Sequence, residues 1–360
     1  MPLRVPRLRR TLGRETRMRR SPTRRTSDDW GSPRHGNPAA RKVSDRLVEL
    51  DTIRAAQERI RPVAVRTPLY PSDVLSAELG IEVRLKLESL QRTGSFKFRG
   101  AYNFVSQIPE DARSKGVITY SSGNHAQAVA LAAQLHGIRA VVVMPTTAPQ
   151  VKRAGAERLG AEVVLEGTTS LERGARAESI AKDEGLEMVP PFDDPRIIAG
   201  AGTVGLEIAE DWDAFGSVLV PIGGGGLCSG TAAALRRLRP DIRIYGVEPT
   251  GGASMKAALS SGEPVTLDCT DSIADGLMPM RTGNLTFAHV SELVDDVVLV
   301  DDDAIRDAAL LLFNQQRLVV EFSGAATVAA LRSGSVEPNG RGVVAVVSGG
   351  NVDPAVLVDL

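Results

Sequence analysis

The chain has 360 residues, of which 42% are hydrophobic, 24% are charged and 4% are aromatic, and its formal net charge at pH 7 is −1. This composition indicates a globular protein of about two domains, and no stretch approaches the ~18 uninterrupted apolar residues of a membrane span. Two cysteines, Cys228 and Cys269, without a CxxC pair argue against a disulfide framework and a cysteine zinc site, so we expect a cytoplasmic protein.

The N-terminal 45 residues differ from the rest in charge. Residues 1–43 carry twelve Arg and one Lys against three acidic residues, whereas the remainder of the chain is acidic. The segment is rich in Pro, Ser and Arg and has almost no apolar periodicity, so residues 1–45 are predicted to be a disordered basic leader or an over-extended translation start. Organelle targeting is a weaker alternative because the segment shows no clear amphipathic helix. Nucleic-acid binding is also weaker because no aromatic residues are interleaved with the arginines.

From about Ser44 onward, short runs rich in β-branched residues alternate with Ala- and Leu-rich helical stretches. The runs are residues 83–88, 116–120, 140–145, 161–166, 217–222, 243–249 and 342–350. Their near-continuous apolar character is typical of strands covered on both faces, and their spacing suits crossover helices. The sequence therefore predicts an α/β architecture with parallel sheets, in which ligands bind beyond the carboxyl ends of the strands.

A lysine lies between two phenylalanines in the segment GSFKFRG, residues 94–100. Burial of an ammonium group is costly unless a partner compensates it, or else it lowers the pKa of the lysine. Lys97 is therefore either a surface residue whose stem contacts apolar neighbours or a neutralised amine with a chemical role. The segment alone leaves both interpretations open.

A polar loop follows the predicted strand 116–120. It consists of Ser121, Ser122, Gly123, Asn124 and His125, and an Ala-rich helix follows. Its backbone amides and polar side chains suit an anion such as a carboxylate, although helix capping alone explains these residues equally well.

Four consecutive glycines separate the predicted strand 217–222 from the next helix. They are Gly223, Gly224, Gly225 and Gly226. Glycine lets the backbone approach a ligand closely, and amides at a helix N-terminus present donors and a positive dipole to an anion. A phosphate group is the favoured ligand, although the Gly-Lys-Ser/Thr ending of a nucleotide P-loop is missing and the fit to GxGxxG is poor.

A third loop begins at Ser348, where the last predicted strand runs into Gly349 and Gly350. Its hydroxyl either meets a buried acceptor such as a ring nitrogen or lies in a plain turn. One amine, one phosphate cradle and two polar loops together suggest a phosphorylated carbonyl cofactor held as a Schiff base, and pyridoxal 5'-phosphate (PLP) is that cofactor.

Six motifs, in this order, resemble those of the serine/threonine dehydratase (threonine ammonia-lyase) and serine racemase family of fold-type II PLP enzymes. They are LQRTGSFKFRGAYN (90–103), SSGNHAQAVALAA (121–133), MPTTAPQVK (144–152), GLEMVPPFDDPRIIAGAGTVGLEI (185–208), PIGGGGLCSG (221–230) and SGGNVD (348–353). The resemblance covers about residues 46 to 353, nearly everything except the leader.

The resemblance implies a role for each site residue. Lys97 carries PLP and serves as the base that takes the Cα proton of the substrate, and Ser122 is the residue that protonates the opposite face of Cα in racemases. The residues implied to contact the cofactor are Phe96, Lys97, Asn124, Gly223, Gly224, Gly225, Gly226, Leu227, Glu321 and Ser348. Those implied to bind the substrate are Ser121, Ser122, Gly123, Asn124 and His125.

The resemblance also implies an activity, namely conversion of L-threonine, L-serine or a related 3-hydroxy amino acid to a 2-oxo acid and ammonia. Serine racemisation in the same site is the alternative, and nucleic-acid binding through the leader is an alternative of another class. Sulfhydrylases of this fold and dinucleotide-dependent oxidoreductases are disfavoured by the loop sequences. Because ten residues follow Gly350, we expect the catabolic type without an amino-acid-sensing domain.

Two departures from the family pattern bear on the site. Phe322 replaces the proline of the EPSGA element after Glu321, and Ser254 replaces an acid that binds a divalent cation in some relatives with a glutamate at the position of Glu248. No metal site is therefore expected.

The resemblance implies a two-domain fold like that of the tryptophan synthase β subunit, with the site in the cleft. The expected large PLP-binding domain comprises residues 46–117 and 194–360, and a small domain of residues 118–193 is inserted. A homodimer or homotetramer acting on a small amino acid is expected, without membrane or nucleic acid.

Overall fold

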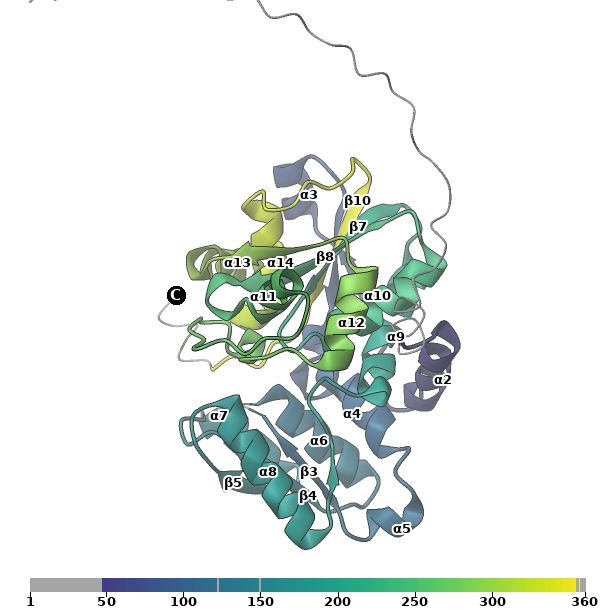
Figure 1. Cartoon of the computed structure of the whole chain (residues 1–360). Coiled ribbons are helices and arrows are strands. Elements are labelled where there is room, and N and C mark those ends of the chain that lie inside the picture. The colour runs from purple at the N-terminus through teal and green to yellow at the C-terminus, as the bar shows by residue number, and fades with distance from the viewer. Residues whose placement is uncertain (1–46, 122, 149, 354–355, 357–360) are drawn as a thin grey trace, which may run out of the picture. The chain divides into compact units, whose positions relative to one another are not determined.

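Two β-sheets organise the part of the chain that this computed structural model describes, namely residues 47–121, 123–148, 150–353 and 356 (Figure 1). The six-stranded sheet has the order β1 (Leu69–Pro71), β2 (Val83–Leu87), β10 (Gly342–Val347), β7 (Phe215–Pro221), β8 (Arg243–Pro249) and β9 (Asp296–Val300). The four-stranded sheet has the order β5 (Glu162–Leu165), β4 (Ala140–Met144), β3 (Val117–Tyr120) and β6 (Glu187–Met188). The leader predicted for residues 1–45 lies outside the described residues.

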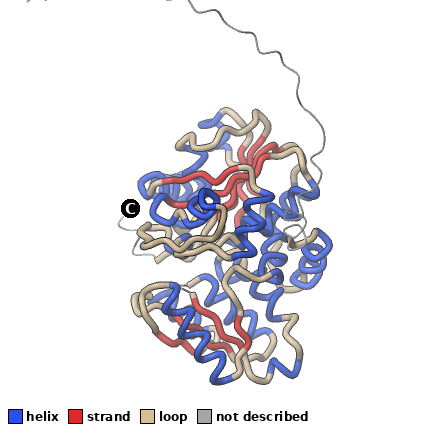
Figure 2. Tube along the Cα trace, in the orientation of Figure 1, coloured by secondary structure: helices blue, strands red, loops and turns tan. Residues whose placement is uncertain are grey.

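Helices cover both faces of the six-stranded sheet (Figure 2). Along β10, Val344 and Val346 belong to one apolar cluster, whereas Val343, Ala345 and Val347 belong to the other. The first cluster includes residues of α2 (Leu50–Ile60), α9 (Pro195–Asp211), α10 (Gly226–Leu238), α11 (Ser254–Ser261) and α12 (Asn284–Leu293). The second includes residues of α3 (Asp73–Leu79), α13 (Asp302–Gln316) and α14 (Phe322–Arg332). This burial on both faces explains the near-continuous apolar runs of the sequence.

The four-stranded sheet is also covered on both faces along its central strands. In β3, Val117 packs into a cluster with residues of α4 (Lys97–Val105) and α6 (Asn124–Leu135), whereas Ile118 packs toward α8 (Ser170–Glu184). Two further helices, α5 (Glu110–Arg113) and α7 (Gln150–Arg158), complete this region. Because α4 shares its core with α6, the domain boundaries at 117/118 and 193/194 stay a prediction.

The seven predicted apolar runs all contain strands. Two features differ from the prediction of parallel strands that are covered on both faces. β1 pairs with β2 in the antiparallel sense. β5 is an edge strand that pairs only with β4 within the described sheet, and Glu162 and Leu165 on it are exposed. The short strands β1, β6 and β9 were not predicted. No helix in the described ranges is long and apolar enough to cross a bilayer.

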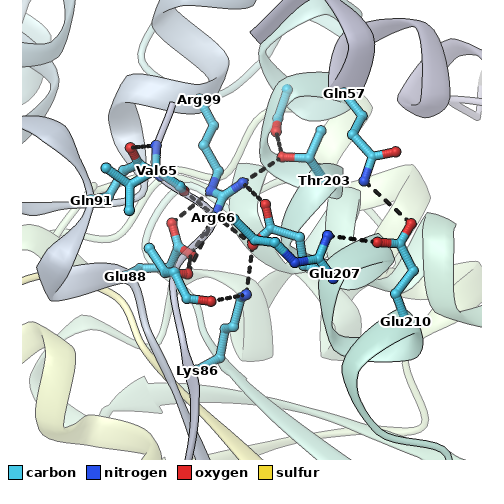
Figure 3. Close-up of polar contacts among 12 residues, drawn as sticks. Gln57, Val65, Arg66, Lys86, Glu88, Gln91, Arg99, Thr203, Glu207 and Glu210 are labelled. Carbon is cyan, nitrogen blue, oxygen red and sulfur yellow. Dashed lines mark hydrogen bonds and ion pairs between the residues drawn. The ribbon is translucent and has the colours of Figure 1, made fainter. Parts of the chain in front are cut away.

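A buried cluster of four charges connects α4 to the large sheet (Figure 3). Arg99, on the first turn of α4, is 0% exposed and donates to both carboxylate oxygens of Glu88 at 2.7 and 2.8 Å. It also donates to both oxygens of Glu207 on α9 at 2.7 and 2.8 Å. Lys86 of β2 donates to Glu207 at 2.6 Å, so two cations balance two anions.

Replacement of Arg99 is predicted to destabilise the protein strongly. In an Arg99→Met variant the carboxylates of Glu88 and Glu207 lose their common partner while they stay buried, and breaking a buried pair costs about 3–5 kcal/mol. Arg139, whose partners Glu162 and Glu184 are exposed, provides the control, since exposed pairs contribute about 1 kcal/mol or less. The stability of both variants is measured from their midpoints of unfolding in urea. Equal losses for Arg99→Met and Arg139→Met would contradict the prediction.

Candidate functional site

A cavity of about 320 Å³ lies where the loops after β3, β7 and β10 meet the first turns of α4, α6 and α10. This size is sufficient for a cofactor or small ligand. Nearly all predicted site residues line it, namely Phe96, Lys97, Ser121, Asn124, His125, Gly223, Gly224, Gly225, Gly226, Leu227, Glu321 and Ser348. Gly123 does not line it, and Ser122 lies outside the described residues.

Lys97 is the first residue of α4, and its ammonium nitrogen is held at one wall of the cavity. Nζ donates to the carbonyl oxygen of Pro191 at 2.8 Å and lies 5.2 Å from the ring centre of Phe96. Burial lowers the pKa of Lys97 to about 8, although the charge of Glu321 opposes the shift. A substantial fraction of this amine is therefore neutral near physiological pH, as a nucleophile or base requires.

The tetraglycine turn leaves the N-terminus of α10 free for an anion. Gly225 is the N-cap residue, has φ +96° and provides no side-chain cap. A Cβ atom at Gly224 would overlap the ring of Phe192. The sequence thus places glycine where the backbone is left-handed or a neighbour is in contact, and the residues of the uncapped first turn of α10, Gly226 and Leu227, line the cavity.

Polar side chains of the loop after β3 form hydrogen bonds both within the loop and to distant residues. The hydroxyl of Ser121 accepts the N–H of Gly123 at 3.1 Å. Nδ2 of Asn124 donates to Oε1 of Glu321 at 2.5 Å, and Oδ1 of Asn124 accepts from Nδ2 of Asn351 at 2.9 Å. Asn124 is therefore oriented by two residues, Glu321 and Asn351, that are distant from it in the sequence.

His125 lines the cavity but is fully neutral at physiological pH. Its Nε2 lies 3.2 Å from the carbonyl oxygen of Val189, which fits a donated N–H. Burial, and to a lesser degree the nearby charge of Lys97, lowers the pKa of His125 to about 3. The ring thus brings no positive charge to a substrate carboxylate, and the predicted carboxylate site depends on the loop amides.

Ser348 is buried at the end of β10, and its backbone links this strand to the lysine segment. The N–H of Phe96 donates to the carbonyl oxygen of Ser348 at 3.1 Å. Its hydroxyl lies 3.5 Å from the carbonyl oxygen of Ser323, which is a long contact. The hydroxyl consequently remains available to a ligand in the cavity.

Four charged residues that the sequence interpretation missed also line the cavity, namely Lys152, Arg173, Asp275 and Arg281. Lys152 forms an ion pair with Asp275, and its pKa is raised because the nearby carboxylates outweigh the effect of burial. Arg173 is 8% exposed, and its Nη1 donates to the carbonyl oxygen of Thr168 at 3.0 Å. Lys152 falls in the matched motif MPTTAPQVK, which was the one available signal.

Glu248, considered above as a cation ligand, instead caps a helix. Its carboxylate oxygens accept the N–H groups of Met255 and Lys256, each at 2.8 Å. Within the described residues, no group of three or more His, Cys, Asp or Glu side chains is arranged to hold a metal ion.

The residues present fit PLP. A phosphate fits the uncapped amides of Gly225 to Leu227, the neutral fraction of Lys97 fits an aldehyde carbon, and the hydroxyl of Ser348 fits a ring nitrogen. The three sets line one cavity of suitable size.

Gly225→Ala is predicted to weaken PLP binding. Alanine disfavours φ +96°, and its Cβ would lie 2.9 Å from Cβ of Thr286 and 3.0 Å from Cε of Met255, so the turn must shift. Gly262→Ala is the matched control, since Gly262 has φ +81° but open space around it. We expect the PLP Kd, measured by absorbance titration of the apoprotein, to rise about tenfold or more for Gly225→Ala only, which corresponds to at least ~1.4 kcal/mol. Equal affinity in both variants would contradict this.

Comparisons with known proteins agree with this cofactor. The family model described as "Pyridoxal-phosphate dependent enzyme" matches residues 60–349. The chain is 43% identical to the L-threonine ammonia-lyase of Thermotoga maritima, over 85% of this chain and 76% of that protein. It is also 43% identical to the catabolic L-threonine dehydratase TdcB of Escherichia coli strain K12, over 86% of this chain and 94% of that protein. The solved structure of maize serine racemase has a TM-score of 0.83 and 38% identity, covering 87% of this chain and 96% of that one. The chain belongs to the family of pyridoxal-phosphate-dependent enzymes.

Proposed function

We propose that this PLP enzyme is an ammonia-lyase that converts L-threonine, L-serine or a related 3-hydroxy amino acid to a 2-oxo acid and ammonia. The observation that carries the proposal is the buried amine of Lys97, which shares a cavity with the uncapped tetraglycine turn and the loop after β3. The 43% identity to an L-threonine ammonia-lyase and to a catabolic L-threonine dehydratase supports the same reaction.

The chain's own residues account for binding and proton transfer. When bound, PLP supplies an electron-accepting ring that stabilises negative charge on the substrate Cα. The amides of the loop from Ser121 to His125 bind the substrate carboxylate, and the neutral amine of Lys97 accepts the Cα proton. The β-hydroxyl leaves as water, and a second water releases ammonia, so that the net reaction yields one 2-oxo acid and one ammonia.

The hydroxyl of Ser348 favours elimination over reactions that need a long-lived carbanion. A neutral serine does not hold a pyridine nitrogen protonated as an aspartate would, so less negative charge is withdrawn from Cα. Early loss of the β-hydroxyl then competes well with reprotonation.

Serine racemisation is the second candidate activity, favoured by the resemblance to maize serine racemase. Both reactions begin with removal of the Cα proton and differ in whether the hydroxyl leaves before Cα is reprotonated. The role proposed for Ser122, protonation of the opposite face, concerns a residue outside the described ranges. A chiral assay of residual serine beside a 2-oxo acid assay separates the two activities.

We further propose that the enzyme works in the cytoplasm as a homodimer or homotetramer on small amino acids and not on nucleic acid. Size-exclusion chromatography with light scattering tests the assembly.

The position of Arg173 favours a further class of substrate, namely 3-hydroxy amino acids with an acidic side chain. Its buried Nε has no hydrogen-bond partner, and within the described part of the chain no carboxylate lies within 4.0 Å of its guanidinium. Three other buried cations, Lys86, Arg99 and Lys152, each pair with a carboxylate. A guanidinium at the cavity wall without an acidic partner suits the side-chain carboxylate of 3-hydroxyaspartate.

Lys97→Ala is predicted to abolish the lyase reaction, because no other cavity amine is free of a carboxylate partner in the described chain. 2-Oxo acid release from threonine and serine should fall to background, and the visible absorbance of bound PLP should disappear. Lys182→Ala, on the exposed side of α8, serves as the control. Continued turnover in Lys97→Ala would refute the assignment.

Arg173→Met is predicted to discriminate between substrate classes. Loss of a hydrogen bond to a charged group costs about 1.5–3 kcal/mol, or roughly ten- to a hundredfold, so kcat/KM for 3-hydroxyaspartate should fall by this factor relative to threonine. Arg176→Met, at an exposed position of the same helix, should leave the ratio unchanged. If Arg173→Met also leaves the ratio unchanged, Arg173 does not select the side chain.

A further inference from the structure

Lys152, the second cavity lysine, is embedded among residues from several distant segments. It lies on the first turn of α7 and is almost completely buried. Its stem passes over the loop after β3, since a Cβ atom at Gly123 would overlap Cδ of Lys152. Its ammonium group forms an ion pair with Asp275, on the short helix η4 (Asp275–Leu277), and lies 4.0 Å from Oε2 of Glu321.

Glu321 is buried, and its two oxygens have different surroundings. Oε1 accepts the amide of Asn124 at 2.5 Å. Oε2 has no hydrogen-bond partner among the described residues, and the ammonium of Lys152 is a cation within 4.0 Å of it. A buried carboxylate oxygen without a hydrogen bond is stable in its charged form only if a nearby cation compensates it.

We propose that Lys152 is a positioning residue that stabilises the ionised form of Glu321, and that the ionised carboxylate in turn holds Asn124 toward the cofactor. The consequence for catalysis rests on the proposed function. A carboxylate accepts an amide hydrogen more strongly than a neutral carboxyl group does, so the charge of Glu321 fixes one hydrogen of Nδ2. The second Nδ2 hydrogen has no other partner among the described residues and stays available to the cofactor.

Charged groups on three neighbouring elements act on Glu321. Lys97 on α4 and Lys152 on α7 lower the pKa of Glu321, and so does the hydrogen bond from Asn124 on α6. Asp275 on η4 raises it, burial raises it most, and the neutral ring of His125 adds no charge. The resulting pKa of about 7 places the titration of Glu321 near physiological pH, where removal of one neighbouring charge changes its ionised fraction strongly.

The two partners of this ion pair should have opposite effects. In Lys152→Met a positive charge beside Glu321 is lost, so the carboxyl pKa rises and Glu321 loses its proton only at higher pH. In Asp275→Asn a negative charge is lost, so the pKa of Glu321 falls. If the pair acted only as a tether between α7 and η4, both variants would break it and would act in the same direction.

Infrared difference spectroscopy of the PLP-loaded enzyme, without substrate, measures the protonation of Glu321 directly as a function of pH. The carboxyl C=O band that Glu321→Gln removes identifies the residue. We expect its midpoint to move up by about one pH unit in Lys152→Met and down in Asp275→Asn, and to stay near the original value in Lys152→Arg, which keeps the charge. The acidic limb of the kcat/KM profile should move in the same directions.

Shifts of the same sign in Lys152→Met and Asp275→Asn, or no shift in either, would overturn the proposal. A Lys152→Met variant that does not fold leaves the downward shift of Asp275→Asn as the deciding result. Because the infrared titration needs no substrate, the opposite shifts support the link between Lys152 and Glu321 even if no 3-hydroxy amino acid is converted. In that case only the proposed function fails.

Discussion

The buried pairing of Arg99 with Glu88 and Glu207 is the constraint on which the position of the reactive lysine depends. Arg99 lies two residues after Lys97 on the same first turn of α4, and its two carboxylate partners come from the residue that follows β2 and from α9. Because a guanidinium with four hydrogen bonds to two buried carboxylates has few alternative positions, the start of α4 is fixed relative to the large sheet. The amine of Lys97 is therefore directed into the cavity rather than toward solvent.

Around that amine, the site contains uncharged backbone donors, two groups that titrate near neutral pH and side chains with a fixed charge. The tetraglycine turn and the loop after β3 present backbone donors, which bind anions without adding a titratable group. Lys97 and Glu321 both titrate near neutral pH, with pKa values of about 8 and 7, because burial disfavours the charged form of each. Lys152 remains charged because Asp275 accompanies it, and Arg173 is a buried cavity guanidinium that forms no ion pair with a carboxylate in the described chain. This arrangement combines a proton acceptor with fixed charges for binding, as a reaction at the Cα of an amino acid requires.

The sequence predicted those parts of the fold and site that depend on local patterns. Strands such as β10 were recognisable because both of their faces are buried, whereas β1 and β6, with three and two residues, are too short to show a pattern. Lys97 and the tetraglycine turn stand in contiguous motifs. The pairing of Lys152 with Asp275 joins residues 123 positions apart, and a single charged residue on a helix looks like one of a solvated face until its partner is known. Likewise, the neutrality of His125 depends on its burial against Val189, which no neighbouring residue in the sequence indicates.

Borohydride reduction of the PLP-loaded protein, followed by peptide mass spectrometry, tests most directly which amine carries the cofactor. Of the two lysines that line the cavity, Lys152 is paired with Asp275 and its pKa is raised, so its amine stays protonated, whereas Lys97 donates only to a carbonyl oxygen. A pyridoxyl adduct should appear on the peptide that contains Lys97 and on no other lysine peptide. An adduct on Lys152 or Lys86, or a protein that remains colourless and unmodified after incubation with PLP, would contradict the assignment of the site.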